Sequence, residues 1–166
     1  MPKRSRTAAR SARSNAQASL DRLRGEPRRN EALLAFGESM FANANRFVRA
    51  GMALEAALDD ADALPQRDAV LAFASRVDAH LAAIARSLRE DAPPPSERLR
   101  TAERALAERL EATKRDDSVD VAVAVADACD RITDSVDTLA YLVRRRGDSA
   151  ATPALGHLDS RRTMNS

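Results

Sequence analysis

One long apolar stripe constrains the fold of this chain more than any other feature. Between about Asn30 and Leu58, apolar or small residues return at alternating steps of four and three, which places them on one face of an α-helix. The stripe consists of Leu33, Gly37, Met40, Ala44, Phe47, Gly51, Leu54 and Leu58. Such a face needs other helices to cover it, so we expect it to hold the core, with its two glycines allowing a neighbouring helix to approach closely.

Four further segments repeat apolar residues with helical spacing. They cover about Ser5–Arg24, Pro65–Arg89, Glu97–Thr113 and Ser118–Arg146. The segment DAPPPS at 91–96 must be a loop, because three consecutive prolines cannot continue a helix. We expect the second and third helices to form a hairpin, and the chain to be an all-α, up-and-down bundle of about five helices.

The composition agrees with this fold class. The 166 residues suffice for one domain with a core, and the chain is 44% hydrophobic but only 3% aromatic, which suits close-packed helices. We expect a single domain over residues 1–146, with Gly147 ending the last helix. Residues 147–166 are rich in Gly, Pro, Ser, Thr and Asn without periodicity, which predicts a disordered tail.

Positive charge is concentrated in the first helix. Residues 1–30 hold nine Lys and Arg against two acidic residues, a net charge of +7, although the whole chain carries only +2. On a helical wheel, Arg6, Arg10, Arg13 and Arg24 fall within about 60° of one another, beside the Ala and Leu stripe of this helix. We expect the basic helix to face something anionic, which is a phospholipid surface, nucleic acid or the acidic remainder of the chain.

Residues with catalytic or metal-binding potential are few. The sequence contains no G-x-S-x-G, glycine-rich phosphate loop, H-E-x-x-H or paired-cysteine motif, so we expect neither enzyme activity nor a cofactor. The single cysteine, Cys129, falls on an apolar face and should pack in the core. We do not expect His80 and His157 to share a metal, because His157 lies in the tail that we expect to be disordered.

A ladder of carboxylates on the last helix is the remaining candidate metal site. It consists of Asp127, Asp130, Asp134 and Asp137, at steps of three, four and three. Acidic residues at this spacing can bind a hard cation when a second helix supplies more ligands. The wheel places them opposite the apolar face, so we expect them to point to water or to arginines of a partner instead.

The run ARSARSNAQASLDRLRGEP, residues 9–27, resembles the segment after the last membrane helix in the fusaric acid resistance (FUSC, YccS-like) family of bacterial inner-membrane proteins. The residues that carry the resemblance are Arg13, Asn15, Ala16, Ser19, Leu20, Arg22, Leu23, Glu26 and Pro27. The Ala-rich segment that follows, and DRITDSVDTLAYLVR at 130–144, are similar to the rest of that family's C-terminal cytoplasmic domain, so the likeness covers residues 9–146.

The resemblance implies a non-enzymatic cytoplasmic domain of, or associated with, an efflux transporter for aromatic acids and other toxic compounds. It implies an assembly or regulatory role at the cytoplasmic face of the inner membrane, where the arginine face of the first helix meets the membrane or the transporter. The alternative is a freestanding soluble adaptor that binds protein or nucleic-acid phosphate through the same helix. Because interleaved aromatic residues are absent there, we do not expect sequence-specific nucleic-acid recognition. The long apolar stripe of the second helix offers a surface on which a second copy of the chain can pack, so a homo-oligomer remains an alternative.

Overall fold

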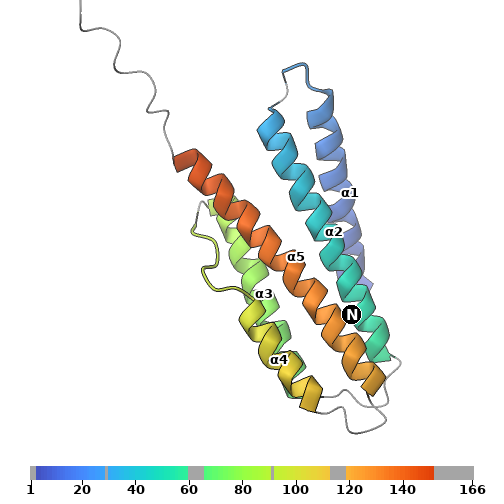
Figure 1. Cartoon of the computed structure of the whole chain (residues 1–166). Helices are drawn as coiled ribbons and strands as arrows, with labels where there is room; N and C mark the ends of the chain where they lie inside the picture. The colour runs from blue at the N-terminus through green and yellow to red at the C-terminus, as the bar shows by residue number, and fades with distance from the viewer. Residues whose placement is uncertain (1–2, 29, 60–65, 91, 113–118, 152–166) are drawn as a thin grey trace, which may run out of the picture.

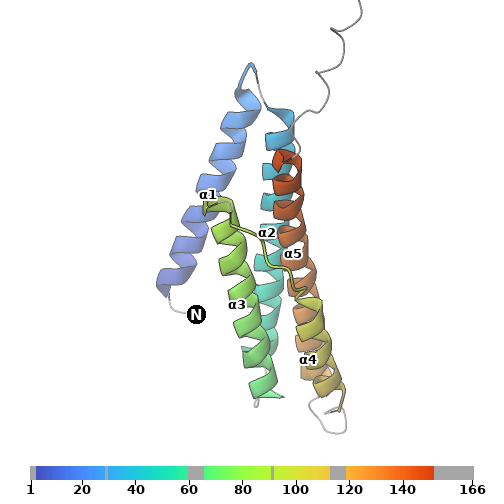
Figure 2. The same ribbon diagram turned by 90° about the vertical axis from the view of Figure 1, so that its left-hand side faces the viewer.

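The computed structural model describes residues 3–28, 30–59, 66–90, 92–112 and 119–151, and in these ranges every regular element is a helix. The elements are α1 (Lys3–Gly25), α2 (Glu31–Asp59), α3 (Arg67–Glu90), α4 (Arg100–Ala112) and α5 (Val119–Ala151). Successive helices alternate in direction along one bundle axis (Figures 1 and 2). The predicted all-α, up-and-down bundle of about five helices is therefore confirmed.

Helix α5 occupies the middle of the bundle. It packs along α2 on one side and against α3 and α4 on the other, whereas α1 lies on the outer side of α2 (Figure 1). The expected hairpin between the second and third helices is wrong at the level of the backbone, because no Cα atom of α2 lies within 8 Å of a Cα atom of α3 in the described ranges. Each of these two helices packs on α5 instead.

Local hydrogen bonds mark where α2 and α3 begin. Asn30 precedes α2, where its Oδ1 accepts a hydrogen bond from the Leu33 amide at 3.0 Å, as an N-terminal cap does. Gln66 precedes α3 with a φ of 50°, and its carbonyl accepts from the amides of Ala69 and Val70. Pro65, expected at the first helical position, lies outside the described residues.

The predicted end of the last helix at Gly147 is wrong. Helix α5 continues through Gly147 to Ala151, and no described glycine has a positive φ. A glycine ends a helix when it adopts the left-handed conformation, whereas inside a helix it costs only about 1 kcal/mol relative to alanine. The predicted domain boundary at residue 146 therefore falls inside α5. The rest of the tail, residues 152–166, lies outside the described residues.

The core is centred on α5 and not on the stripe of α2. Ala50 is the one buried residue of α2, and its stripe residue Leu33 is 39% exposed. Helix α5 buries Ala122, Val125, Ala128, Cys129, Ile132, Val136, Leu139, Ala140 and Val143. The expectation that the stripe holds the core is confirmed only in part. Its residues Met40, Phe47, Leu54 and Leu58 are partly buried and pack against the core, whereas most fully buried residues belong to α3, α4 and α5.

The two stripe glycines differ in what they contact. A Cβ atom added to Gly37 would lie 2.8 Å from Cδ2 of Leu20, the buried leucine of α1, so α1 approaches α2 closely at this point. A Cβ atom added to Gly51 would meet nothing within 4 Å. The close approach predicted for this stripe therefore occurs at Gly37 and not at Gly51.

Alanine substitutions at the two glycines should have different effects on stability. Gly51→Ala removes a helix penalty of about 1 kcal/mol without a new contact, so we expect it to raise the free energy of unfolding by up to about that amount. Gly37→Ala removes the same penalty but pushes Leu20 aside, so its gain should be smaller or reversed. Urea unfolding followed by circular dichroism measures both, and equal gains would contradict the close packing at Gly37.

Candidate functional site

Helix α1 is held to the bundle through its C-terminal half. Among the described helices it contacts α2 only, and Leu20 is the one buried residue in the stretch 7–25 of this helix. Arg24 fixes this end of the helix, since its guanidinium donates to Glu38 of α2 at 2.8 and 3.0 Å and to Asp21 at 2.7 Å. The hydrogen bond with Glu38 is the main reason why the pKa of Arg24 is raised.

The four arginines expected to face a membrane or partner therefore divide into groups. Arg10 and Arg13 are exposed and form no hydrogen bond or ion pair with a described residue. Arg24 is engaged with Glu38 and Asp21, so its guanidinium joins α1 to α2. Arg6 lies in α1, but its side chain is outside the described residues. Of the four expected arginines, the structure thus leaves Arg10 and Arg13 without a partner among the described residues.

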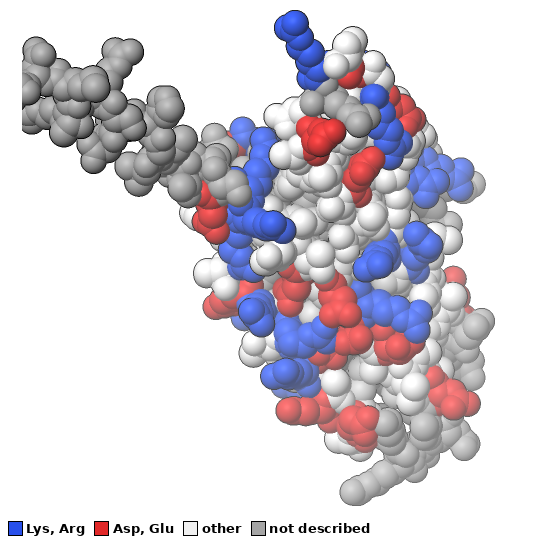
Figure 3. All heavy atoms as spheres, turned by 45° about the horizontal axis from the view of Figure 1, so that its top comes forward, with Lys and Arg blue, Asp and Glu red and all other residues white. Residues whose placement is uncertain are grey.

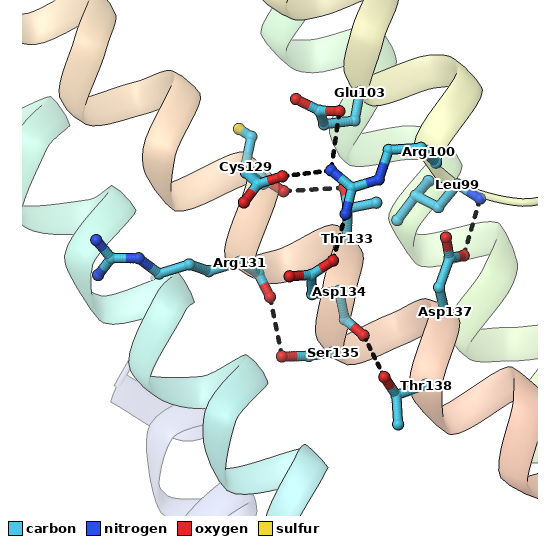
Figure 4. A network of polar contacts seen from close by, with 11 residues as sticks. Leu99, Arg100, Glu103, Cys129, Arg131, Thr133, Asp134, Ser135, Asp137 and Thr138 are labelled. Atoms are coloured by element: carbon cyan, nitrogen blue, oxygen red, sulfur yellow. Dashed lines mark hydrogen bonds and ion pairs between the residues drawn. The ribbon is translucent and has the colours of Figure 1, made fainter.

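The carboxylate ladder of α5 is engaged within the chain (Figure 4). Arg100, the first residue of α4, forms ion pairs with both Asp130 and Asp134. Asp137 accepts a hydrogen bond at 3.0 Å from the amide of Leu99, just before α4 begins. Most of the ladder therefore fixes the start of α4 against α5, with Arg100 taking the place expected for an arginine of a partner.

The other members of this network are local. Asp127 pairs with Arg131 one turn further along α5. Arg100 also donates to the buried carboxylate of Glu103 at 3.2 Å, and its hydrogen bond with Asp130 is the main reason why the pKa of Arg100 is raised. Asp134 stays 67% exposed, so the expectation that the ladder faces water holds in part.

His80 and Cys129 are used in packing. His80 is buried, with Nδ1 lying 2.9 Å from the carbonyl oxygen of Arg76 and Nε2 lying 3.0 Å from that of Glu97, so it joins α3 to the following loop. Burial raises the pKa of the Cys129 thiol to about 12. Within the described ranges, no three His, Cys, Asp or Glu side chains are grouped so that they could hold a metal ion. His157 lies outside those ranges.

Several arginines that matter in the structure escape sequence reasoning. Arg100 differs from other exposed helix residues only through its place beside the ladder, which requires the tertiary arrangement of α4 and α5. Arg46 and Arg49 of α2 and Arg131 of α5 line a common groove, although Arg49 and Arg131 are far apart in the sequence. Local spacing signals two ion pairs of this network, Asp127 with Arg131 at a spacing of four and Arg100 with Glu103 at a spacing of three.

Comparisons with known proteins identify no relative. No family model, no curated protein and no solved structure matches this chain. In the part of the chain that the structure describes, none of the helices has the combination of length and apolar character needed to cross a bilayer.

Removing Arg100 should weaken the attachment of α4. We expect Arg100→Ala to lower the free energy of unfolding by about 1–2 kcal/mol, because it leaves the carboxylate of Glu103 buried and removes the cation of Asp130 and Asp134. The loss should shrink at high salt, which screens the exposed pairs. Arg104→Ala, on an exposed position of the same helix, should change stability by less than about 0.5 kcal/mol. Urea unfolding compares them, and equal losses would contradict the role of Arg100.

The Cys129 thiol should be unreactive in the folded protein. Its pKa of about 12 and its burial keep it protonated and shielded at about pH 8, where an ordinary exposed thiol is partly ionised. We expect an aromatic disulfide reagent to label it more than about a hundredfold more slowly in the native state than in denaturant. Comparable rates in both states would show that α5 does not enclose Cys129.

Proposed function

We propose that this chain is a non-enzymatic helical domain whose first helix contacts an anionic surface at the cytoplasmic face of a membrane. The observation that carries the proposal is the pair Arg10 and Arg13, which are exposed and form no ion pair with a described residue. The contacts that hold this helix to α2, made by Leu20 and Arg24, lie nearer its C-terminal end. Both guanidinium groups are available to phosphate or carboxylate outside the chain.

The physical basis of this contact is electrostatic. A basic residue next to an anionic membrane surface contributes about 1 kcal/mol to binding, and the effect adds over neighbouring residues. Helix α1 supplies such residues along one face, which lies beside Leu20, the residue through which this helix packs on α2. Attachment through the C-terminal half, fixed by Arg24 and Glu38, lets the arginines meet a surface while the bundle stays intact.

We further propose that the anionic surface belongs to the membrane environment of a transporter similar to the FUSC family, in whose assembly or regulation this domain takes part. The resemblance of residues 9–27 to the segment after the last membrane helix of that family supports this assignment. A non-enzymatic role is supported by His80 and Cys129, the described side chains best suited to acid–base or nucleophilic chemistry, because both are buried in packing contacts.

Binding to phospholipid vesicles tests this function. Vesicles of phosphatidylcholine with and without phosphatidylglycerol are sedimented with the wild-type chain and with Arg10→Glu/Arg13→Glu. We expect the wild type to bind only the anionic vesicles and the double variant to bind them at least about tenfold more weakly, because two attractive charges become repulsive. Circular dichroism checks that the exposed substitutions leave the helices folded.

A matched control separates a specific face from overall charge. Arg86 and Arg89 are exposed on α3 with the same spacing of three, so Arg86→Glu/Arg89→Glu changes the net charge equally. This control should retain the affinity of the wild type. Equal losses in both double variants would contradict a role for α1, and tight binding to double-stranded DNA with no binding to vesicles would favour the adaptor that contacts nucleic-acid phosphate.

A further inference from the structure

A groove between α2 and α5 is lined by arginines that take no part in the contact proposed for α1. It has a volume of about 650 Å³, within the range of about 300–1,000 Å³ that small-molecule sites occupy. Its lining consists of Asn43, Arg46, Arg49, Ala50, Arg131, Asp134, Ser135 and Thr138. None of these residues belongs to α1, so the groove is separate from the proposed membrane-facing helix.

The charges of the groove are not balanced within the described residues. Among the described residues, Arg46 has no hydrogen-bond or ion-pair partner, and Arg49 donates there only to the carbonyl oxygen of Asn45, at 3.4 Å. The acidic member of the lining, Asp134, is paired with Arg100, while Arg131 is paired with Asp127 and reaches toward α2 (Figure 4). Two guanidinium groups on adjacent turns of α2 therefore have no anionic partner in the part of the chain that the structure describes.

The polar groups of the lining also favour a ligand that accepts hydrogen bonds. The hydroxyls of Ser135 and Thr138 donate to carbonyl oxygens one turn earlier in α5. Asn43 donates one amide hydrogen to the carbonyl of Ser39, which leaves its second N–H available. The donors that remain for a ligand are thus mainly the N–H groups of guanidinium and amide side chains. Phosphate matches them, because it carries negative charge and several acceptor oxygens.

We propose that the α2–α5 groove binds the phosphate group of a phosphomonoester or diphosphate, with Arg46 and Arg49 as its main ligands. A guanidinium group can donate two parallel hydrogen bonds to the oxygens of one phosphate. The exposed side chains of Arg46 and Arg49 lie on adjacent turns of α2, so both can reach the same phosphate. Arg131 adds positive charge at the opposite wall of the groove. Asn43, which also lines the groove, supplies an uncharged donor.

The groove lies on the same side of the bundle as the arginines of α1. Glu38, Arg46 and Arg49 fall within about 80° of one another on the wheel of α2, and Glu38 is the partner of Arg24. On α1, Arg24 shares its face with Arg10 and Arg13. Figure 3 shows one face of the molecule on which Lys and Arg side chains lie across the middle of the bundle with acidic side chains among them.

Calorimetric titration with inorganic pyrophosphate tests the site. We expect saturable binding to the wild-type chain at one site, and binding at least about tenfold weaker to Arg46→Gln/Arg49→Gln, since each lost charge-assisted hydrogen bond weakens the complex severalfold or more. Arg86→Gln/Arg89→Gln removes the same charge elsewhere on the exposed surface and should bind within about twofold of the wild type. An absence of saturable binding to the wild type, or an equal loss in the control, would overturn the proposal.

Two further variants keep the test decisive. Arg10→Glu/Arg13→Glu should retain pyrophosphate binding, so failure of the vesicle experiment and failure of this one are distinguishable. Arg46→Lys/Arg49→Lys keeps the charge and loses paired hydrogen bonding, so we expect an intermediate affinity if a guanidinium geometry is required. Wild-type affinity in the lysine variant, with a difference between the wild type and the glutamine variant that is seen only at low salt, would mean that charge alone attracts pyrophosphate. That result would overturn the proposal.

The source of the phosphate follows from a vesicle comparison. Phosphatidic acid presents a phosphomonoester and phosphatidylglycerol a phosphodiester. Stronger binding to phosphatidic acid vesicles that pyrophosphate competes away, and that Arg46→Gln/Arg49→Gln abolishes, would assign the groove to a lipid headgroup. Equal binding to both lipids, with pyrophosphate affinity retained, would assign it to a free phosphorylated ligand.

Discussion

The packing of α5 against three other helices is the contact on which the rest of the structure depends. Val125 and Val136 of this helix are completely buried, and they lie in a core to which α3 contributes Phe73 and Ile84. Because α2 and α3 meet α5 and not each other's backbone, no other helix could hold the bundle together. This arrangement leaves α2 with one open flank and α1 without any contact to the centre of the molecule.

Two kinds of electrostatic contact surround this core, and they serve different purposes. Arg100 joins α4 to the carboxylates of α5, and Arg24 joins α1 to Glu38 of α2, so these two arginines are part of the architecture. Arg10, Arg13 and Arg46 form no ion pair with a described residue, so their charge remains available outside the chain. We propose that this second group carries the function. In this proposal, the anionic surface and the phosphate ligand are contacted by separate helices on one side of the bundle.

The sequence predicts what is decided locally. Apolar spacing identified all five helices, and the prolines at 93–95 identified the loop before α4, because both depend on neighbouring residues. The end of α5 was missed because a glycine is tolerated inside a helix that is stabilised by packing elsewhere. The pairing of Arg100 with Asp130, the poor burial of Leu33 and the arginine groove were missed because each depends on which helices become neighbours.

Hydrogen exchange measured by mass spectrometry, with and without anionic vesicles, tests most directly whether α1 is a loosely held basic helix on a bundle centred on α5. In the free protein, amides of α1 should exchange fastest among the described helices and those in the middle of α5 slowest, in line with their burial. Anionic vesicles should slow exchange in α1 and leave α5 unchanged. Protection of α1 equal to that of α5 in the free protein, or vesicle-induced protection confined to the other helices, would contradict the account.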